Sequence, residues 1–348
     1  MPDETILSVR DLNVKFNLRG RTLHAIRGVS LDVYKGESLA IVGESGSGKT
    51  VLTKTFMGLL DNNGWIDSGS ILFDGEDLAK FREEKDWLKI RGRKIAMVLQ
   101  DPMTSLNPLK SIGRQIGEAL ALHQGLKGEA AKRRIQEILL DVGIQDPAQR
   151  MKQYPHQFSG GMRQRVVIAI AIACNPQVLI CDEPTTALDV TIQAQILDLI
   201  RGLVRKYHLT CIYITHDLGV VANVADRIAV MYAGDIVEIG SSEEIFYSPR
   251  HPYTWALLSS LPQLGIKGEE LSSIRGTPPS LFTHIQGDAF APRNPHALNI
   301  DFLQLPPYFD VTPSHKVRSW LLDPRAPEVK PPAVLSRIRR EGDSLYDE

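Results

Sequence analysis

The sequence has little net charge, and this shortage excludes some classes of partner. Its 40 basic and 41 acidic residues leave a formal net charge of −1 across 348 residues. No field of the whole chain therefore points to nucleic acid or to an acidic membrane surface. The short basic clusters at 132–134 and 337–340 are interpreted as solvated faces or tails.

The sequence also has few cysteines and no long apolar run. Cys174, Cys181 and Cys211 stand in apolar stretches without metal-site spacing, which favours small buried thiols in a reducing compartment over a disulfide framework. The longest apolar run, Val166–Cys174, has about half the length that a bilayer-spanning helix needs. The N-terminal residues do not have the pattern of a secretory signal. We therefore expect a soluble protein that can dock on a membrane protein.

What the sequence does contain is an alternation of buried strands and helices. Apolar runs end at Gly43, Gln100, Asp182 and His216, and most are followed by stretches with helical periodicity. This pattern predicts an α/β fold with a parallel-sheet core covered on both sides. Residues 5–14 and 29–33 alternate apolar and polar positions instead, as strands with one exposed face do.

Two segments depart from this alternation. Residues from about 111 to 165 have helical periodicity and few β-branched runs, which indicates a helical insert. After about residue 262 proline becomes dense and long helices disappear, so we expect a small irregular C-terminal domain. No internal repeat and no low-complexity tract is found in the sequence.

A glycine loop for phosphate lies between a predicted strand and a predicted helix. It fits G-x-x-x-x-G-K-[ST] and consists of Gly43, Glu44, Ser45, Gly46, Ser47, Gly48, Lys49 and Thr50. Glycines let successive backbone N–H groups wrap around phosphate oxygens, and the helix that follows adds its positive end. Lys49 is expected to reach the β- and γ-phosphates, and the Thr50 hydroxyl to ligate Mg²⁺.

Polar residues at three other strand ends complete a candidate site for ATP hydrolysis. Asp182 ends a buried strand and suits the Mg²⁺ side, while the next residue, Glu183, can orient or deprotonate the attacking water. The amide of Gln100 can reach Mg²⁺ or that water, and the imidazole of His216 can contact the γ-phosphate. Each of these residues taken alone would be read as structural, and their combination with the phosphate loop favours function.

Together with "FSGGMRQR" and "LICDEPTTALD", these motifs resemble the ATP-binding-cassette (ABC) ATPases over residues 5–262. The resemblance implies a P-loop NTPase cassette with an N-terminal antiparallel β subdomain and a helical subdomain at about 101–165. It makes Ser159, Gly160 and Gly161 the signature, Asp189 the D-loop aspartate and Gln100 the Q-loop glutamine. It implies that the signature of one subunit caps the γ-phosphate held by another. Phe16 is the best candidate for an aromatic that stacks on adenine.

A narrower resemblance links the chain to the D-type ATPase subunits of oligopeptide and dipeptide importers. It depends on "QDPMTSLNP", "YPHQFSGGMRQR", "HPYTWALLSSLP" and "RGTPPSL". It implies a nucleotide-binding domain at 1–262, an importer-type C-terminal domain at 263–330 and a tail at 331–348. The implied partners are two membrane permease subunits, a paralogous F-type ATPase subunit and an extracytoplasmic peptide-binding protein, with no nucleic acid. The implied location is the cytoplasmic face of the membrane, and residues 100–160, with 101–107 at the centre, are expected to include the permease-docking surface.

The chain departs from this family at an expected iron–sulfur segment. Many members carry a G-C-x-F-x-x-R-C pattern, whereas Asp288 and Asn294 stand at the two cysteine positions here. Because cluster ligation needs thiolates, we predict no iron–sulfur cluster. We expect the segment to be held by packing of Phe290, Phe302, Tyr308 and Trp320. The signature also departs from the usual Leu-Ser-Gly-Gly-Gln at Phe158 and Met162.

Three other functions stay open at this point. An importer ATPase for nickel or for a glycan-derived ligand would carry the same motifs, because the ATPase does not touch the solute. An ABC ATPase acting on nucleic acid would usually carry a long coiled coil or a second cassette, and neither is found in this sequence. A non-catalytic subunit is disfavoured by the intact Lys49, Asp182, Glu183 and His216.

Overall fold

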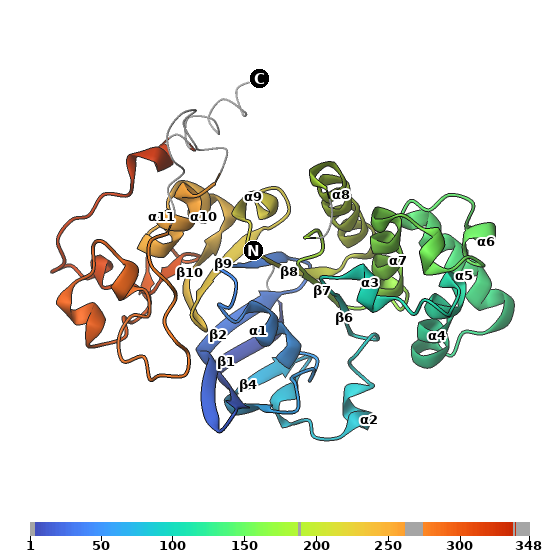
Figure 1. Ribbon diagram of the computed structural model, residues 1–348, viewed down its shortest axis with the longest axis horizontal. Helices are drawn as coiled ribbons and strands as arrows, with labels where there is room; N and C mark the ends of the chain where they lie inside the picture. The colour runs from blue at the N-terminus through green and yellow to red at the C-terminus, as the bar shows by residue number, and fades with distance from the viewer. Residues whose placement is uncertain (1–3, 187–188, 262–273, 337, 339–348) are drawn as a thin grey trace. The chain divides into compact units, whose positions relative to one another are not determined.

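The computed structural model describes residues 4–186, 189–261, 274–336 and 338. These residues divide into two compact units, and each unit is assembled from separate stretches of the chain (Figure 1). The first unit contains Tyr34–Ser38 and Lys80–Ile214, and the second contains Ile6–Val33, Leu39–Ala79 and the described residues from Thr215 onward. The phosphate loop therefore belongs to the second unit, and the signature and Glu183 belong to the first.

An antiparallel sheet forms one layer of the second unit. Its strands, in the order β2-β1-β4-β5, are β2 (Arg21–Tyr34), β1 (Thr5–Leu18), β4 (Gly64–Phe73) and β5 (Glu76–Asp77). Leu7 of β1 lies opposite Phe73 of β4. The predicted strands at 5–14 and 29–33 are confirmed, and both are longer than predicted. They extend to a tight turn in which Arg19 and Gly20 take left-handed backbone conformations.

The second unit also contains the strand that leads into the phosphate loop. This strand, β3 (Ser38–Val42), is fully buried and pairs in parallel with β9 (Arg227–Tyr232). β9 pairs antiparallel with β10 (Asp235–Ser241). The helices of this unit are α1 (Lys49–Thr55), α9 (Leu218–Val221), α10 (Ser242–Tyr247) and α11 (Pro252–Ser259).

The C-terminal segment of the second unit extends this sheet. Strands β11 (Phe309–Asp310) and β12 (Lys316–Val317) form a short hairpin, and β12 pairs antiparallel with β10. Elsewhere the segment is irregular, as its proline content predicts, with single 3₁₀ turns such as Ala291–Arg293 and Trp320–Leu322. The irregular segment is thus joined to the cassette by backbone hydrogen bonds.

A parallel sheet and a helical layer form the first unit. The strands β6 (Ile95–Val98), β7 (Val178–Asp182) and β8 (Thr210–Thr215) are parallel neighbours in that order. The helices are α2 (Glu84–Trp87), α3 (Pro102–Ser105), α4 (Ile112–Gln124), α5 (Gly128–Asp141), α6 (Pro147–Arg150), α7 (Gly160–Ile172) and α8 (Val190–Tyr207). Helices α4 to α7 pack against one another (Figure 1), which confirms the predicted helical insert. Among the described helices, none has the length and apolar character needed to cross a membrane.

Helix α7 is buried on more sides than an amphipathic helix would be. Its residues Val166, Val167, Ile168 and Ala169 are all buried, while Ile170 is half-exposed. Apolar spacing alone favours a stripe built on Val166, Ile170 and Ala173; Val166 and Ala173 are buried and Ile170 is half-exposed. Helix α7 packs against α3, α4, α5, α8 and strand β6, so its buried surface is wider than one stripe.

The aromatic residues expected to hold the C-terminal segment do so only in part. Phe290 is fully buried, with its ring centroid 5.3 Å from those of Tyr232 and Tyr253. Tyr308 is half-buried and donates its hydroxyl to the Ile236 carbonyl at 2.6 Å. Phe302, however, is exposed, so the expectation is wrong for that residue.

Two polar side chains also stabilise the C-terminal segment, by forming local turns. The Asp288 Oδ1 accepts the backbone N–H of Phe290 at 2.9 Å, and the Asn294 Oδ1 accepts that of His296 at 2.9 Å. Both side chains stabilise local turns in the way short polar residues commonly do. The two positions that hold cysteines in many resembling proteins thus serve as backbone acceptors in this chain.

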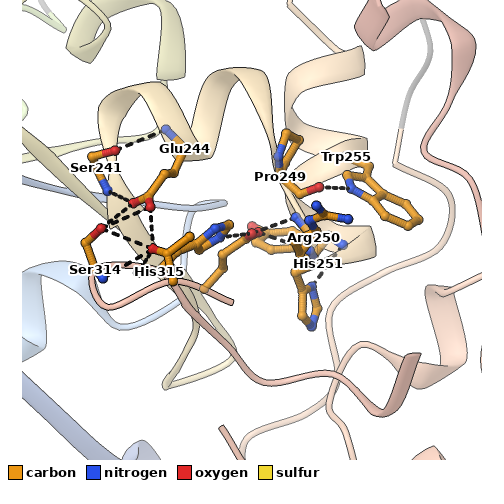
Figure 2. A network of polar contacts seen from close by, with 11 residues as sticks. Ser241, Glu244, Pro249, Arg250, His251, Trp255, Ser314 and His315 are labelled. Carbon is orange, nitrogen blue, oxygen red and sulfur yellow. Dashed lines mark hydrogen bonds and ion pairs between the residues drawn. The ribbon is translucent and has the colours of Figure 1, made fainter. Parts of the chain in front are cut away.

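A buried carboxylate network ties the C-terminal hairpin to α10 and α11 (Figure 2). Glu238 of β10 accepts the backbone N–H groups of Arg250 and His251 and contacts the His315 ring at 2.7 Å. Glu244 of α10 accepts the Ser314 hydroxyl at 3.0 Å. Because each carboxylate joins residues far apart in sequence, the hairpin and both helices are fixed together.

The buried Asp288 makes stability depend on pH. Burial raises its pKa to about 7, so between about pH 4 and pH 7 the folded protein keeps a proton that the unfolded chain has lost. The free energy of unfolding therefore falls as pH rises through this window, by roughly 4 kcal/mol at most. Asp288→Asn keeps the acceptor oxygen and cannot ionise. We expect it to raise the melting temperature at about pH 8 and to match wild type near about pH 4 in thermal-shift scans.

Asp323, in the same segment, provides a control whose pKa is shifted in the opposite direction. At Asp323 the hydrogen bond from Arg325 lowers the pKa to about 2, so the ionised form favours the folded state above that pH. Asp323→Asn is on the surface and should give no gain in melting temperature at about pH 8. An Asp288→Asn protein that melts with the same pH profile as wild type would contradict the assignment.

Candidate functional site: a nucleotide-binding and hydrolysis centre

The phosphate loop has a backbone that only glycine can supply at its first residue. Gly43 has φ 152°, and a Cβ placed on it would lie 2.0 Å from the Met231 carbonyl oxygen of β9. Gly46 and Gly48 also have positive φ, of 79° and 105°. Such conformations are costly for residues with side chains. The close approach to β9 therefore requires glycine at position 43, and the positive φ angles favour glycine at 46 and 48.

Lys49 is held inside the loop by the loop's own carbonyl groups. Its Nζ donates to the oxygens of Gly43 at 2.7 Å and Glu44 at 2.9 Å, and the side chain is buried. The backbone N–H of Gly234 donates to the Ser47 carbonyl at 2.8 Å, which fixes the middle of the loop to the β9–β10 turn. Thr50 follows in the first turn of α1, as predicted. The cation is thus placed within the turn that would surround a phosphate.

Phe16, the candidate for adenine stacking, lies near the end of β1 and is buried. Its ring packs over Gly64 of β4, where an added Cβ would come within 2.5 Å of a ring carbon. Gly64 is the cross-strand partner of Phe16, and a larger residue at position 64 would overlap the Phe16 ring. The stacking role stays a prediction.

In the first unit, Asp182 and Glu183 take different conformations at the end of β7. Asp182 is buried and ends the strand in regular pairing with β8. Glu183 has φ 45°, a left-handed conformation that costs a residue with a Cβ roughly 1–2 kcal/mol. Its backbone N–H still donates to the Ile214 carbonyl at 2.9 Å. The change of conformation directs the two neighbouring carboxylates differently, as their separate expected roles require.

The Glu183 carboxylate is oriented by two donors. The Gln100 Nε2 donates to Glu183 Oε2 at 2.8 Å, and the Thr186 Oγ1 donates to the same oxygen at 2.9 Å. Gln100 lies two residues beyond the end of β6. The structure therefore brings together two of the predicted site residues, and it adds Thr186, which sequence reasoning missed. Its signal was the hydroxyl residue three positions after the acidic pair in "DEPTT".

The signature residues lie at the exposed start of α7. Ser159 is the N-cap residue, and its Oγ accepts the Met162 backbone N–H at 3.4 Å. Ser159 and Gly160 are exposed, while Phe158 is buried. The departure from leucine at 158 therefore changes an apolar contact and leaves the exposed serine and glycines unchanged. A helix start with free N–H groups is suited to an anion.

Two further predicted residues lie at exposed positions. Asp189 is the residue before α8, and His216 follows β8. Both are therefore accessible to a ligand or a partner. His216 belongs to the second unit and Asp189 to the first.

The donor set fits ATP with Mg²⁺. Among the described residues, no group of three or more His, Cys, Asp or Glu side chains forms a metal cage. Mg²⁺ seldom needs such a cage, because it is usually bound by one or two protein oxygens together with waters and substrate phosphates. The Thr50 hydroxyl and the Asp182 carboxylate are oxygens of the required kind.

Comparison with known proteins agrees with these features. A family model described as ABC transporter matches residues 26–186, and one described as Oligopeptide/dipeptide transporter, C-terminal region, matches residues 237–300. Oligopeptide transport ATP-binding protein AmiE of Streptococcus pneumoniae is 59% identical, with 96% of this chain and 94% of that protein covered. Dipeptide transport ATP-binding protein DppD of Lactococcus lactis is 54% identical, with 98% of each covered.

Solved structures give the same result for the fold. cbiO1 of Clostridium perfringens, part of the ABC transporter complex cbiONQ, aligns with a TM-score of 0.61 at 30% identity, covering 71% of this chain and 92% of that one. MJ0796, a bacterial ABC transporter cassette solved as a dimer, aligns with a TM-score of 0.60 at 26% identity, covering 68% and 98%. The chain therefore belongs to the ABC transporter ATP-binding proteins, in the family that includes the oligopeptide and dipeptide transport ATP-binding proteins.

Proposed function

We propose that this ATPase powers the uptake of oligopeptides or dipeptides by an ABC importer. The observation that carries the proposal is the likeness to peptide-transport ATP-binding proteins, which extends over the cassette and the C-terminal segment alike. An importer ATPase for nickel or for a glycan-derived ligand is the alternative, since the ATPase of such a system does not touch the solute. The similarity to oligopeptide and dipeptide transport ATP-binding proteins favours peptides.

In the second unit, the phosphate loop binds the triphosphate. Backbone N–H groups of residues 43–50 would donate to the phosphates, and the Lys49 ammonium, now held by the Gly43 and Glu44 carbonyls, would pair with phosphate oxygens. The Thr50 hydroxyl would be a ligand for Mg²⁺, Phe16 would stack on adenine and His216 would contact the γ-phosphate. ATP and Mg²⁺ supply the phosphoryl group and its charge neutralisation.

In the first unit, Glu183 orients the attacking water and accepts its proton. Gln100 and Thr186 both donate to Oε2 of this carboxylate, so the two side chains fix its orientation. Gln100 would also offer its amide to Mg²⁺ or to the attacking water, and it joins the Glu183 carboxylate to the end of β6. The Asp182 carboxylate would be a ligand for Mg²⁺.

We further propose a head-to-tail dimer in which Ser159, Gly160 and Gly161 cap the γ-phosphate bound by a second ATPase subunit, with Asp189 at the same interface. The exposure of Ser159 and Gly160 supports this role. A similar cassette is described as a dimer in a post-hydrolysis state bound to ADP and phosphate. The second subunit would be a paralogous F-type ATPase.

The remaining partners follow from the same proposal. Two permease subunits would hold the ATPase at the cytoplasmic face of the membrane, and an extracytoplasmic peptide-binding protein would deliver the peptide. Leu109, just beyond the proposed docking centre at 101–107, is 86% exposed, which suits a surface that a permease covers. We retain 1–262 as the nucleotide-binding domain and 263–330 as the C-terminal domain.

The role of Glu183 is tested by Glu183→Gln. The substitution keeps a hydrogen-bond acceptor for Gln100 and Thr186 but removes the base, so we expect ATP affinity within about twofold of wild type and turnover reduced by at least about 100-fold. Nucleotide titration and phosphate release, measured on the assembled ATPase, check the two quantities. Glu129→Gln, at an exposed ion pair of α5, is the matched control. Hydrolysis near the wild-type rate in Glu183→Gln would refute the assignment.

The transported solute is tested by uptake in cells that lack this gene. Restoring wild type should restore accumulation of labelled di- and oligopeptides, and restoring Glu183→Gln should not, because the ATPase supplies the energy for transport. Accumulation of nickel or of a glycan fragment, with no change for peptides, would favour the alternative.

The absence of an iron–sulfur cluster is a separate prediction. Asp288 and Asn294 accept backbone hydrogen bonds and offer no thiolate. Protein purified without oxygen should have no visible cluster absorbance and no stoichiometric iron by metal analysis. Either signal would overturn our interpretation of the segment 287–294.

A further inference from the structure

The phosphate loop is held by an arginine that lies about 250 residues later in the chain. The Arg293 Nη1 contacts Glu44 Oε2 at 2.6 Å, and its Nη2 contacts Glu44 Oε1 at 3.0 Å. This is the two-point geometry in which guanidinium and carboxylate bind most specifically. The Arg293 side chain is 4% exposed and that of Glu44 26%. Arg293 is also the arginine of the G-C-x-F-x-x-R-C pattern, retained where both cysteines are replaced.

The other donors of Arg293 are used as well. Its Nε donates to the Arg275 carbonyl at 2.8 Å and Nη2 to the Ile274 carbonyl at 3.3 Å. Nη1 donates to the Tyr232 hydroxyl at 3.1 Å. The hydrogen bonds to Glu44 raise the pKa of the guanidinium above its usual value, so it stays charged. A planar group held on three sides cannot rotate away from Glu44 without breaking several bonds.

Glu44 is fixed through its backbone as well as through its carboxylate. Its N–H donates to the Tyr253 hydroxyl at 2.8 Å, and its carbonyl accepts the Lys49 Nζ at 2.9 Å. Arg293 and Tyr253 thus hold the residue whose carbonyl in turn holds the phosphate-binding lysine. The position of Lys49 depends on Glu44, and the position of Glu44 depends on the C-terminal segment and α11.

The groups that hold Glu44 are themselves rigidly supported. The rings of Tyr232, Tyr253 and Phe290 form a buried cluster, with the Tyr232 and Tyr253 centroids 4.5 Å apart. His251 caps α11 by accepting the Tyr253 N–H at 3.0 Å, and its own backbone N–H donates to Glu238. His315 of the C-terminal hairpin contacts the same Glu238.

A simpler explanation is that the ion pair only attaches the C-terminal segment. Other contacts already do this: the β10–β12 pairing, the Arg318–Asp235 ion pair at 2.6 Å and the Tyr308 hydrogen bond to Ile236. None of these three contacts involves a residue of the phosphate loop. Attachment therefore does not require a buried arginine directed at the second residue of that loop.

We propose that Arg293 is a positioning residue of the nucleotide site, which holds Glu44 and so keeps the phosphate loop and Lys49 in the geometry that binds ATP. Through this contact, the C-terminal segment contributes to the ATP affinity of the cassette. The proposal rests on the proposed role of the phosphate loop.

The test compares Arg293→Gln, Glu44→Gln and the double variant. The full chain is titrated with a fluorescent ATP analogue and Mg²⁺, and its melting temperature is measured in parallel. If the pair positions the loop, each single variant should weaken binding about tenfold, and the double variant should be no weaker than the worse single variant, because both substitutions remove one contact. Arg293→Lys, which keeps the charge but loses the two-point geometry, should fall between wild type and Arg293→Gln.

Control variants distinguish an effect on the position of the phosphate loop from an effect on stability or on net charge. Leu139→Ala, in the buried face of α5, should lower the melting temperature without changing affinity. Arg325→Gln removes an exposed two-point pair with Asp323 and should change neither. A double variant that binds like wild type would show that only net charge matters, and an unchanged affinity in Arg293→Gln would also overturn the proposal.

Two further outcomes are distinguished by the same measurements. If Arg293→Gln does not fold, Tyr253→Phe tests the same positioning of Glu44, because it removes the hydroxyl that accepts the Glu44 N–H. An unchanged ATP affinity in Tyr253→Phe would then overturn the proposal. Failure of the wild-type chain to bind the analogue would instead contradict the proposed nucleotide site itself.

Discussion

The close approach of the phosphate loop to strand β9 is the constraint on which the second unit depends. The Met231 carbonyl occupies the space that a Cβ of Gly43 would need, and Gly234 of the following turn donates to the Ser47 carbonyl. The loop is therefore shaped by β9 before any ligand is considered. Strand β9 also pairs with β10, which in turn pairs with β12 of the C-terminal hairpin.

The polar residues of the site lie where buried strands end. Strands β3, β7 and β8 are fully buried, so their polar neighbours can reach solvent or a ligand only at the strand ends. Glu183 takes a left-handed conformation at this boundary, and its carboxylate is then oriented by Gln100 and Thr186. Local strain of this kind is common at functional sites, where the surrounding structure maintains it.

The C-terminal segment shows how a family feature can persist after its chemistry has changed. Asp288 and Asn294 replace thiols with turn-forming acceptors, while Phe290 keeps its buried place among the aromatic rings. Arg293 keeps its position as well and contacts the phosphate loop. In this chain the segment is therefore organised by aromatic packing, turn hydrogen bonds and the Arg293 ion pair.

The sequence by itself determined the α/β class, the helical insert, the phosphate loop and the strand-end residues Gln100, Asp182 and Glu183, because these depend on local periodicity and on motifs with fixed spacing. Local patterns could not predict that the buried surface of α7 would be wider than one stripe, that Phe302 would be exposed or that Thr186 would orient Glu183. The contact between Glu44 and Arg293 joins residues about 250 positions apart. Such contacts were decided only by the tertiary structure, since burial and long-range pairing depend on which surfaces the folded chain brings together.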